Sequence, residues 1–532
     1  MKKYSKPNRK ALNSLGFTFE GGGTIPTPTS WGQWLKNQPA PRSKPGHKLD
    51  HLTIYTSGNF QEYDLSLDLN QRWGYALNVG YCNDYERTIA DAKLPTPVTT
   101  SGKLLRLAID DPAKYPVALA TTQIWYRDEP YTQASKMLKE AYLRDAAGNV
   151  IGDWSPEATP LAMSISIEFK CAPLVAMQAL GINVTNIYDG GERGLHITGD
   201  TPNASFGLDP RVVAARGSED WVQYISRKKG EHLRLLYNRI KEIFPNRTNY
   251  VWYSACGSPF SAIPGARNYG YLYSEINNVH DLPSGSWYWR DTAISSAGMG
   301  NPSITDRAYF DVFTHWMEAV EEQEVQYHQT ASYNFVSAGT LNGGNPAYFF
   351  LPIPSYKGFL KCMYATGQRG AVAGYFADDV DPRSANYPAF NPSTPPHWIL
   401  QQMALGEVHA RFTWLDEYIL DGDLLPGVGS GKIKSYLPPY EFTANKKVGD
   451  FYAPIPDIRV LVRKRKQQDK WLVVLWAAEQ GTPLTAVTTS PDKLAWVKDI
   501  PGLPPIEFTA SGEGSIYTVV RTDGNLVITR MD

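Results

Sequence analysis

The middle of the chain alternates between strand-like and helix-like segments, and this alternation limits the fold more than any other feature of the sequence. Short β-branched or aromatic runs indicate buried strands, and apolar residues at 3.6 spacing indicate helices. Strands are predicted at 164–169, 182–188, 249–254, 286–289, 330–336 and 371–376. Helices are predicted at 172–180, 218–243, 306–324, 356–366 and 396–419.

Repeated strand–helix units predict a parallel sheet that helices bury on its faces. Residues 160–420 hold about five such units, and the run at 75–79 raises the count to six or seven. That count approaches the eight of a TIM-like (β/α)8 barrel, and a doubly wound open sheet is the competing architecture. The sequence contains neither GxGxxG after a strand nor GxxxxGK[ST], which favours the barrel and predicts no nucleotide cofactor.

The two ends of the chain have different patterns. Residues 1–65 are predicted to form an extended N-terminal arm, with Trp31 and Trp34 as its anchors, and 94–116 a long Pro-rich loop. After the TIM-like barrel at 66–425, residues 426–532 carry only short strands and predict a C-terminal all-β sandwich domain. DGN at 523–525 predicts a hairpin turn, and RKRK at 463–466 a solvated hairpin tip. The expected fold class is therefore α/β.

The composition indicates which classes of molecule the protein can bind. The formal net charge is −1, so nucleic acid is not expected, whereas aromatic residues make up 12% of the chain and charged residues 20%. Tyr (32) and Trp (15) offer flat apolar faces with polar edges, which suit neutral ligands such as sugars. We expect a carbohydrate partner and no membrane span, because no run of about 18 apolar residues occurs. Oligomeric state stays open.

Neither the N-terminus nor the cysteines indicate secretion. The first 17 residues are basic without an apolar core, so no signal peptide is expected; a cytoplasmic protein and one whose signal has been removed fit equally. The 4 cysteines are widely spaced, and they are expected to be free and buried.

Acidic residues follow several of the predicted strands. In a parallel barrel the catalytic groups project from the carboxyl ends of strands. The strand at 182–188 runs into Asp189 and Glu192, that at 286–289 into Asp291, and that at 371–376 into Asp378 and Asp379. Glu275 follows another aromatic run, and Glu168 lies within 164–169. Each carboxylate could instead cap a helix or pair with a nearby base.

Other chemistries lack their motifs. GxSxG and HExxH are absent, and the 9 histidines show no ligand spacing on a helix. Asp378, Asp379 and Asp381 could hold a divalent cation, but they lack the spacing of an EF-hand loop. We therefore expect no metal and no cofactor.

Residues 182–193 (INVTNIYDGGER), 286–291 (SWYWRD), 374–379 (GYFADD) and the helix at 398–419 resemble (β/α)8-barrel glycoside hydrolases with a C-terminal β-sandwich. The resemblance covers about 160–532 and implies cleavage of glycosidic bonds by two carboxylates. The Asn-Glu pair of the large retaining clan is absent, and Glu275 stands in the reversed order SEINN.

This hypothesis assigns Glu192 as general acid and Asp379 as nucleophile or base, with Asp378 orienting it. Asp189, Glu275 and Asp291 are substitute catalytic candidates. The expected substrate-binding residues are Trp287, Trp289, Trp252, Tyr188, Arg290 and Asn334. The alternatives are a non-catalytic carbohydrate-binding protein on a degenerate barrel, and a polysaccharide lyase that uses Arg193 and Arg290.

Overall fold

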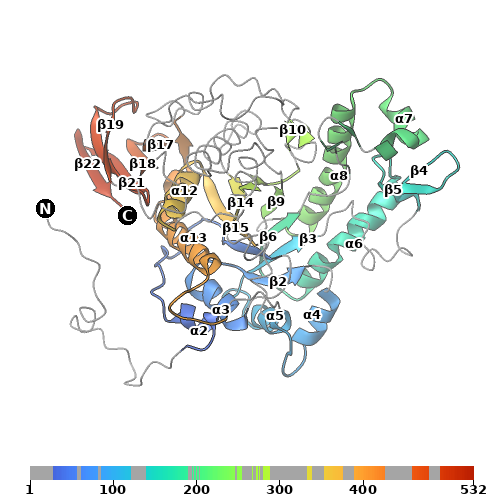
Figure 1. Ribbon diagram of the computed structural model, residues 1–532, viewed down its shortest axis with the longest axis horizontal. Coiled ribbons are helices and arrows are strands. Elements are labelled where there is room, and N and C mark those ends of the chain that lie inside the picture. The colour runs from blue at the N-terminus through green and yellow to red at the C-terminus, as the bar shows by residue number, and fades with distance from the viewer. Residues whose placement is uncertain are drawn as a thin grey trace.

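The structure of the chain is a computed structural model (Figure 1). The structure describes residues 28–56, 62–81, 85–121, 139–189, 195, 197–198, 201–202, 204–245, 249–253, 266–267, 271–272, 275, 279–284, 286–287, 332–337, 353–375, 389–425, 458–477 and 492–532.

Two parallel sheets occupy the centre. The first has five strands in the order β12-β9-β6-β3-β2, and every pairing in it is parallel. Its members are β2 (Leu77–Tyr81), β3 (Val117–Thr121), β6 (Val184–Asp189), β9 (Asn249–Tyr253) and β12 (Leu282–Ser284). The predicted strands at 75–79, 182–188 and 249–254 are thereby confirmed.

The second sheet has four strands in the order β1-β15-β14-β13, again all parallel. Its members are β1 (Thr53–Thr56), β13 (Ser286–Trp287), β14 (Ser332–Ser337) and β15 (Gln368–Tyr375). The two sheets meet at two places. Leu52, just before β1, forms a parallel bridge with Tyr75, just before β2, and only residue 285 separates β12 from β13.

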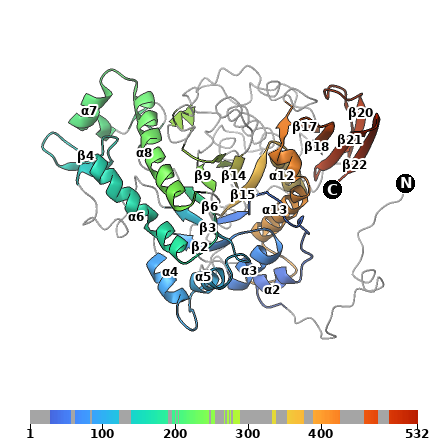
Figure 2. The same ribbon diagram turned by 180° about the vertical axis from the view of Figure 1, so that it is seen from behind.

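Helices flank the central strands on both sides and below in both views (Figures 1 and 2). Their burial in two apolar clusters, one around β1 and β15 and one around β2, β3 and β6, produces the helix-on-sheet layering expected of strand–helix repeats. The described helices are α2 (Trp31–Lys36), α3 (Tyr63–Arg72), α4 (Tyr85–Ala92), α5 (Thr100–Asp110), α6 (Pro160–Ala179), α7 (Pro210–Arg216), α8 (Trp221–Ile243), α12 (Ile353–Ala365), α13 (His397–Thr413) and α14 (Asp416–Leu420).

Short elements decorate this frame. They are the 3-10 turns η2 (Lys139–Ala141) and η3 (Ala204–Leu208) and the two-stranded pairs β4 (Tyr142–Arg144) with β5 (Val150–Trp154), β7 (Ile197–Thr198) with β8 (Thr201–Pro202), and β10 (Ala266–Arg267) with β11 (Tyr271–Leu272).

The N-terminal segment is anchored by aromatic side chains, as the sequence predicts. Ser30 caps α2 by accepting from the Gln33 N–H, and Trp31 is fully buried. The Trp31 ring lies 4.8 Å from the Phe390 ring, centroid to centroid. The arm also contributes β1, so its residues form part of the central sheet.

The predicted strand at 164–169 is wrong, because these residues lie inside α6. Thr159 caps this helix by accepting from the Ala162 N–H, and Pro160 occupies its first turn. Met163, Ile167 and Leu174 are buried at helical spacing. The period-two pattern was a short coincidence within a 20-residue apolar helix. Glu168 therefore ends no strand; its carboxylate pairs with Arg239 of α8 at 2.8 Å.

By length and composition, α6 is the one helix in the described part of the chain that could cross a membrane. Half of its apolar window is buried inside the protein, as in the core helix of a globular fold. It also carries an ion pair through Glu168.

Two other expectations need correction. The predicted loop at 94–116 contains α5, whose Thr99 cap accepts from the Gly102 N–H and whose Leu104 and Leu105 are buried. The predicted helix at 396–419 is divided into α13 and α14 at Trp414 and Leu415. The helix predicted at 306–324 lies outside the described residues.

The C-terminal part is antiparallel. Five strands pair in the order β16-β17-β18-β21-β22, and β19 pairs with β20. These strands are β16 (Gly422–Leu424), β17 (Ile458–Arg465), β18 (Lys470–Ala477), β19 (Lys493–Val497), β20 (Ile506–Ala510), β21 (Ser515–Thr522) and β22 (Asn525–Arg530). Asp523 and Gly524 both have positive φ (49° and 81°), the geometry of the hairpin turn predicted at DGN.

The central strand β18 is buried on both faces. Leu472, Val474 and Trp476 belong to the cluster that includes α12, whereas Val473 and Leu475 pack with β19 and β20. This double burial explains why β18 reads as a continuous apolar run. It also makes the C-terminal sheet continuous with the body of the protein, beside α12 in both views (Figures 1 and 2).

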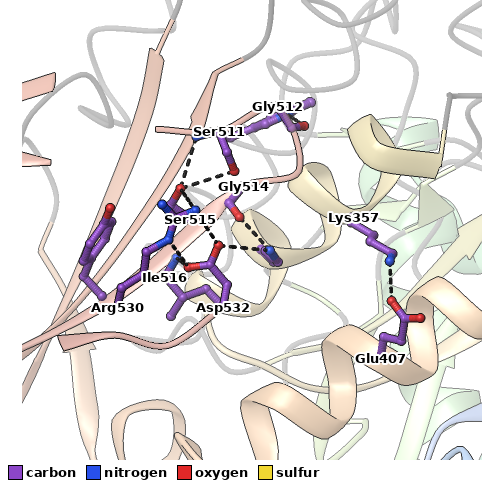
Figure 3. Close-up of polar contacts among 12 residues, drawn as sticks. Lys357, Glu407, Ser511, Gly512, Gly514, Ser515, Ile516, Arg530 and Asp532 are labelled. Carbon is purple, nitrogen blue, oxygen red and sulfur yellow. Dashed lines mark hydrogen bonds and ion pairs between the residues drawn. The ribbon is translucent and has the colours of Figure 1, made fainter. Parts of the chain in front are cut away.

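Polar contacts close the same junction (Figure 3). Lys361 of α12 donates to the Gly514 carbonyl at 2.6 Å, and Trp476 donates to the Gly512 carbonyl at 3.2 Å. Asp532 accepts from the Ile516 N–H at 3.0 Å and pairs with Arg530 at 3.0 Å. The chain segment after β22 is thus tied to β21, whose Ile516 belongs to the same apolar cluster as α12.

The RKRK segment is only partly a hairpin tip, which corrects the sequence prediction. Arg463 to Arg465 belong to β17, and Arg463 is 2% exposed. Its guanidinium donates to the carbonyls of Tyr418 and Ile419, and to that of Gly422. Burial lowers the pKa of Arg463 to about 10. A long basic side chain here satisfies carbonyls at the end of α14, which no charge pattern reveals.

We predict that Gly358→Ala destabilises the protein despite the better helix propensity of alanine. A Cβ at Gly358 would collide with the Trp476 indole, whose Cε2 would lie at 2.9 Å. The expected loss is about 1–3 kcal/mol in the free energy of unfolding, the usual cost of overpacking. Urea denaturation followed by circular dichroism measures it.

The matched control is Gly207→Ala in η3, where an added Cβ would meet nothing within 4 Å. Equal effects of the two substitutions would contradict the close approach of α12 to β18.

Candidate active site at the carboxyl ends of the parallel strands

Three predicted residues lie at the carboxyl end of neighbouring strands. Asp189, the last residue of β6, pairs with Thr121 of β3 and with Trp252 of β9. Tyr188 pairs with Val251 one position earlier. Adjacent strands are about 4.8 Å apart, so the backbones of Asp189 and Trp252 are direct neighbours. The register therefore brings an acidic and an aromatic candidate to one edge.

The second sheet contributes Trp287, the last residue of β13. Trp287 pairs with Val336 of β14, and β14 pairs in turn with β15. Because all these pairings are parallel, the carboxyl ends of β13, β14 and β15 share one edge.

Asn334 is buried where β14 packs against β15. Its side chain is 1% exposed, and Nδ2 donates to Gln368 Oε1 at 2.7 Å and to Ser332 Oγ at 3.1 Å. These contacts hold β14 to β15 and leave the amide buried away from solvent. The structure gives Asn334 a place between two strands, whereas the sequence prediction assigned it to substrate.

Glu275 is held by a helix. Its carboxylate Oε1 accepts from Gln223 Nε2 of α8 at 2.5 Å. A Cβ at Gly230 would collide with the Glu275 carbonyl oxygen, so α8 approaches this backbone closely. The described contacts of Glu275 are thus with α8.

The remaining candidates lie outside the described residues. They are Glu192, Asp291, Asp378, Asp379, Trp289 and Arg290. What the structure does place is the strand end that precedes each of them, namely Asp189 of β6, Trp287 of β13 and Tyr375 of β15.

Below this edge, a polar network crosses between the two sheets. The hydroxyl of Tyr333 on β14 donates to the His51 carbonyl at 2.5 Å and lies 3.3 Å from Thr53 Oγ1 of β1. Asn186 of β6 donates through Nδ2 to the Tyr333 hydroxyl and to the His51 carbonyl. Tyr333 is fully buried and Asn186 is 1% exposed, so these bonds form in a region of low dielectric.

No sequence pattern predicts this network as a whole. One signal was present, because Asn186 interrupts the apolar run VTNIY and a buried amide needs partners. Tyr333 and His51 carry no comparable signal, since their partners come from segments far away in the sequence.

Four histidines of the described residues have strongly lowered pKa values. Burial, assisted by the nearby His47, lowers the pKa of His51 to about 4. His409 of α13 pairs through Nδ1 with the Tyr364 hydroxyl at 2.7 Å, and burial lowers its pKa to about 3. Burial likewise lowers the pKa values of His232 and His280 to about 4. All four are neutral at pH 7.

Within the described ranges, no group of three or more His, Cys, Asp or Glu side chains could hold a metal ion. The acidic cluster at 378–381 falls outside those ranges.

No family model and no curated protein sequence matches this chain. The solved structures that it resembles are glycoside hydrolases. A noncanonic maltogenic α-amylase, AmyB from Thermotoga neapolitana, matches at 8% identity and a TM-score of 0.41, covering 90% of this chain and 97% of that one. The endo-β1,6-glucanase BT3312 matches at 10% identity and a TM-score of 0.41, covering 90% and 93%.

A variant of the α-galactosidase AgaA from Geobacillus stearothermophilus matches at 10% identity and a TM-score of 0.42, covering 94% of this chain and 57% of that one. All three matches have TM-scores below 0.5, so they carry no argument about the fold or the reaction of this chain.

We predict that the protein loses stability as the pH falls from 6.5 toward 4. An unfolded histidine takes up a proton near pH 6.5, whereas His51, His232, His280 and His409 stay neutral in the folded state until about pH 4 or below. The unfolded state therefore binds more protons in this window, and each histidine removes up to about 1.4 kcal/mol per pH unit. Urea midpoints at pH 7.5, 6, 5 and 4.5 measure the effect.

His409→Gln should flatten this pH dependence by about one histidine's share, with a lower stability at pH 7.5 from the lost packing. A pH dependence identical to that of the unsubstituted protein would contradict the buried neutral state of His409.

Proposed function

We propose that this protein is a glycoside hydrolase that cleaves a poly- or oligosaccharide by a two-carboxylate mechanism. The observation that carries the proposal is the parallel strand edge. Carboxylates follow the carboxyl ends of three parallel strands, one in the first sheet and two in the second. Glu192 comes three residues after β6, Asp291 four after β13, and Asp378 three after β15.

The proposal includes closure of the two sheets into one eight-stranded barrel. Its support is the pairing of β1 with β15, the bridge between Leu52 and Tyr75, and the single residue between β12 and β13. Counting β12 and β13 as one strand, the order is then β1, β2, β3, β6, β9, β12/β13, β14, β15. In such a barrel the three carboxylate-bearing ends surround one mouth.

In this mechanism one carboxylic acid protonates the leaving oxygen, and a second carboxylate attacks the anomeric carbon or activates a water. Glu192 is the proposed acid and Asp379 the proposed nucleophile or base, oriented by Asp378. Asp189, Asp291 and Glu275 are substitutes, and the Gln223 contact makes Glu275 the weakest of them.

Aromatic residues at the same edge would bind the sugar rings. Trp252 and Trp287 end or nearly end their strands, and Trp289, Tyr188 and Arg290 are close in sequence. Indole faces stack on pyranose rings, and a guanidinium donates to hydroxyls. In the proposed division residues 66–425 form the barrel together with β1, which the 1–65 arm supplies, and residues 426–532 form a β-sandwich.

We predict that Glu192→Gln and Asp379→Asn each lower hydrolysis by at least about a thousandfold, because acid–base or nucleophilic groups supply effects of that size. A panel of poly- and oligosaccharides, read by release of reducing ends, first identifies a substrate. The kcat of each variant on that substrate is then compared, with circular dichroism as the check on folding.

Glu242→Gln is the control, because Glu242 is a 66% exposed side chain on α8 that pairs with Arg239. Full hydrolytic activity in both Glu192→Gln and Asp379→Asn would refute the assignment. Binding of a glycan without any hydrolysis by the unsubstituted protein would favour a carbohydrate-binding protein instead.

A further inference from the structure

The carboxyl ends of β6 and β15 belong to different sheets, so something must set the distance between them. β6 leads to Glu192 and β15 to Asp379. Among the described residues, the backbones of the two sheets meet at their edges, at the Leu52–Tyr75 bridge, and one residue of sequence separates β12 from β13. A two-carboxylate reaction depends on this distance, because it decides whether water fits between the two groups.

Tyr333 connects the two strands from inside. Its backbone pairs with Gly370 of β15, and its hydroxyl accepts from the amide of Asn186, three residues before the end of β6. The same hydroxyl bonds the His51 carbonyl just before β1. One rigid aromatic side chain from β14 therefore lies against β15 and reaches β6.

The sequence of β15 leaves room for this ring. A Cβ at Gly370 would collide with Cε2 of the Tyr333 ring and would lie 3.1 Å from the His51 carbonyl. Only glycine allows the ring to lie against β15 while its hydroxyl reaches β6. Tyr333, Gly370 and Asn186 are all buried, so solvent does not compete for these contacts.

We propose that Tyr333 is a positioning residue that sets the spacing between the β6 end, which carries the proposed acid, and the β15 end, which carries the proposed nucleophile or base. This inference rests on the proposed function. Tyr333 does not touch substrate; it acts through Asn186 on β6 and through Gly370 on β15.

The test compares Tyr333→Phe with Tyr75→Phe. The first substitution keeps the ring and removes the hydroxyl that joins the sheets. The second removes a buried hydroxyl of the same kind, which donates to the Gln402 carbonyl of α13 at 2.9 Å and links the residue before β2 to a helix. Both variants should show a similar fall in melting temperature.

Only Tyr333→Phe should lower kcat, by about tenfold or more with KM within about twofold, because small misplacements of reacting groups are costly. It should also change the interval between the two apparent pKa values of the kcat/KM profile, because coupled carboxyls report their separation. Gly370→Ala, which displaces the ring, should reproduce this signature. If Tyr333→Phe keeps the kcat and the pH profile of the unsubstituted protein while losing stability as Tyr75→Phe does, the inference is overturned.

A readout without substrate separates this result from failure of the proposed function. Hydrogen exchange of amides 184–189 and 370–375 should accelerate in Tyr333→Phe and stay unchanged in Tyr75→Phe. An inactive unsubstituted protein with this exchange pattern would refute the proposed function and keep the coupling of the two strands. Unchanged exchange in Tyr333→Phe would refute the coupling itself.

Discussion

The parallel pairing of β1 with β15 is the contact on which the rest of the structure depends. It brings Thr53–Thr56 beside Val372–Tyr375, although these segments lie more than 300 residues apart. The loss of chain entropy on closing such a loop is offset by buried apolar area and by backbone hydrogen bonds that water cannot replace inside the protein. Without β1, the edge of β15 would expose unpaired amides and carbonyls.

Burial on two faces recurs in the C-terminal part and explains how the parts hold together. β18 packs one face against α12 and the other against β19 and β20. The approach of α12 requires Gly358, which gives the Trp476 indole its space. Arg463 and Lys361 then satisfy carbonyls that this packing removes from water. The antiparallel sheet is therefore a structural continuation of the helix layer around the parallel strands.

Two kinds of contact position the candidate site, namely backbone pairing between strands and side-chain hydrogen bonds. Backbone register places Asp189 beside Trp252 at the edge of one sheet and Trp287 at the edge of the other, whereas the network beneath them depends on side chains from separate strands. Register follows from regular hydrogen bonding. The network depends on single residues, namely a tyrosine with room beside it and an amide in an apolar strand.

Most strands of the central sheets, the helices α8, α12 and α13, and the all-β character of the C-terminal part could be read from the sequence, because period and turn chemistry are local properties. The helices α2, α3, α4, α5 and α7 were not predicted. The strand prediction at 164–169 was wrong for the opposite reason. The helix is favoured there because α6 buries one side over 20 residues, which a six-residue window does not reveal.

The sequence by itself determined that strands and helices alternate along the middle of the chain, that Trp31 and Trp34 are aromatic anchors, and that acidic residues come just after strand ends. Tertiary structure alone decided that β1 pairs with β15, that Asn334 serves strand packing, that Glu275 meets Gln223, and that Tyr333 joins two sheets. The physical reason is distance along the chain. Propensities and periods act over a few residues, whereas these contacts join segments brought together only when the apolar clusters form.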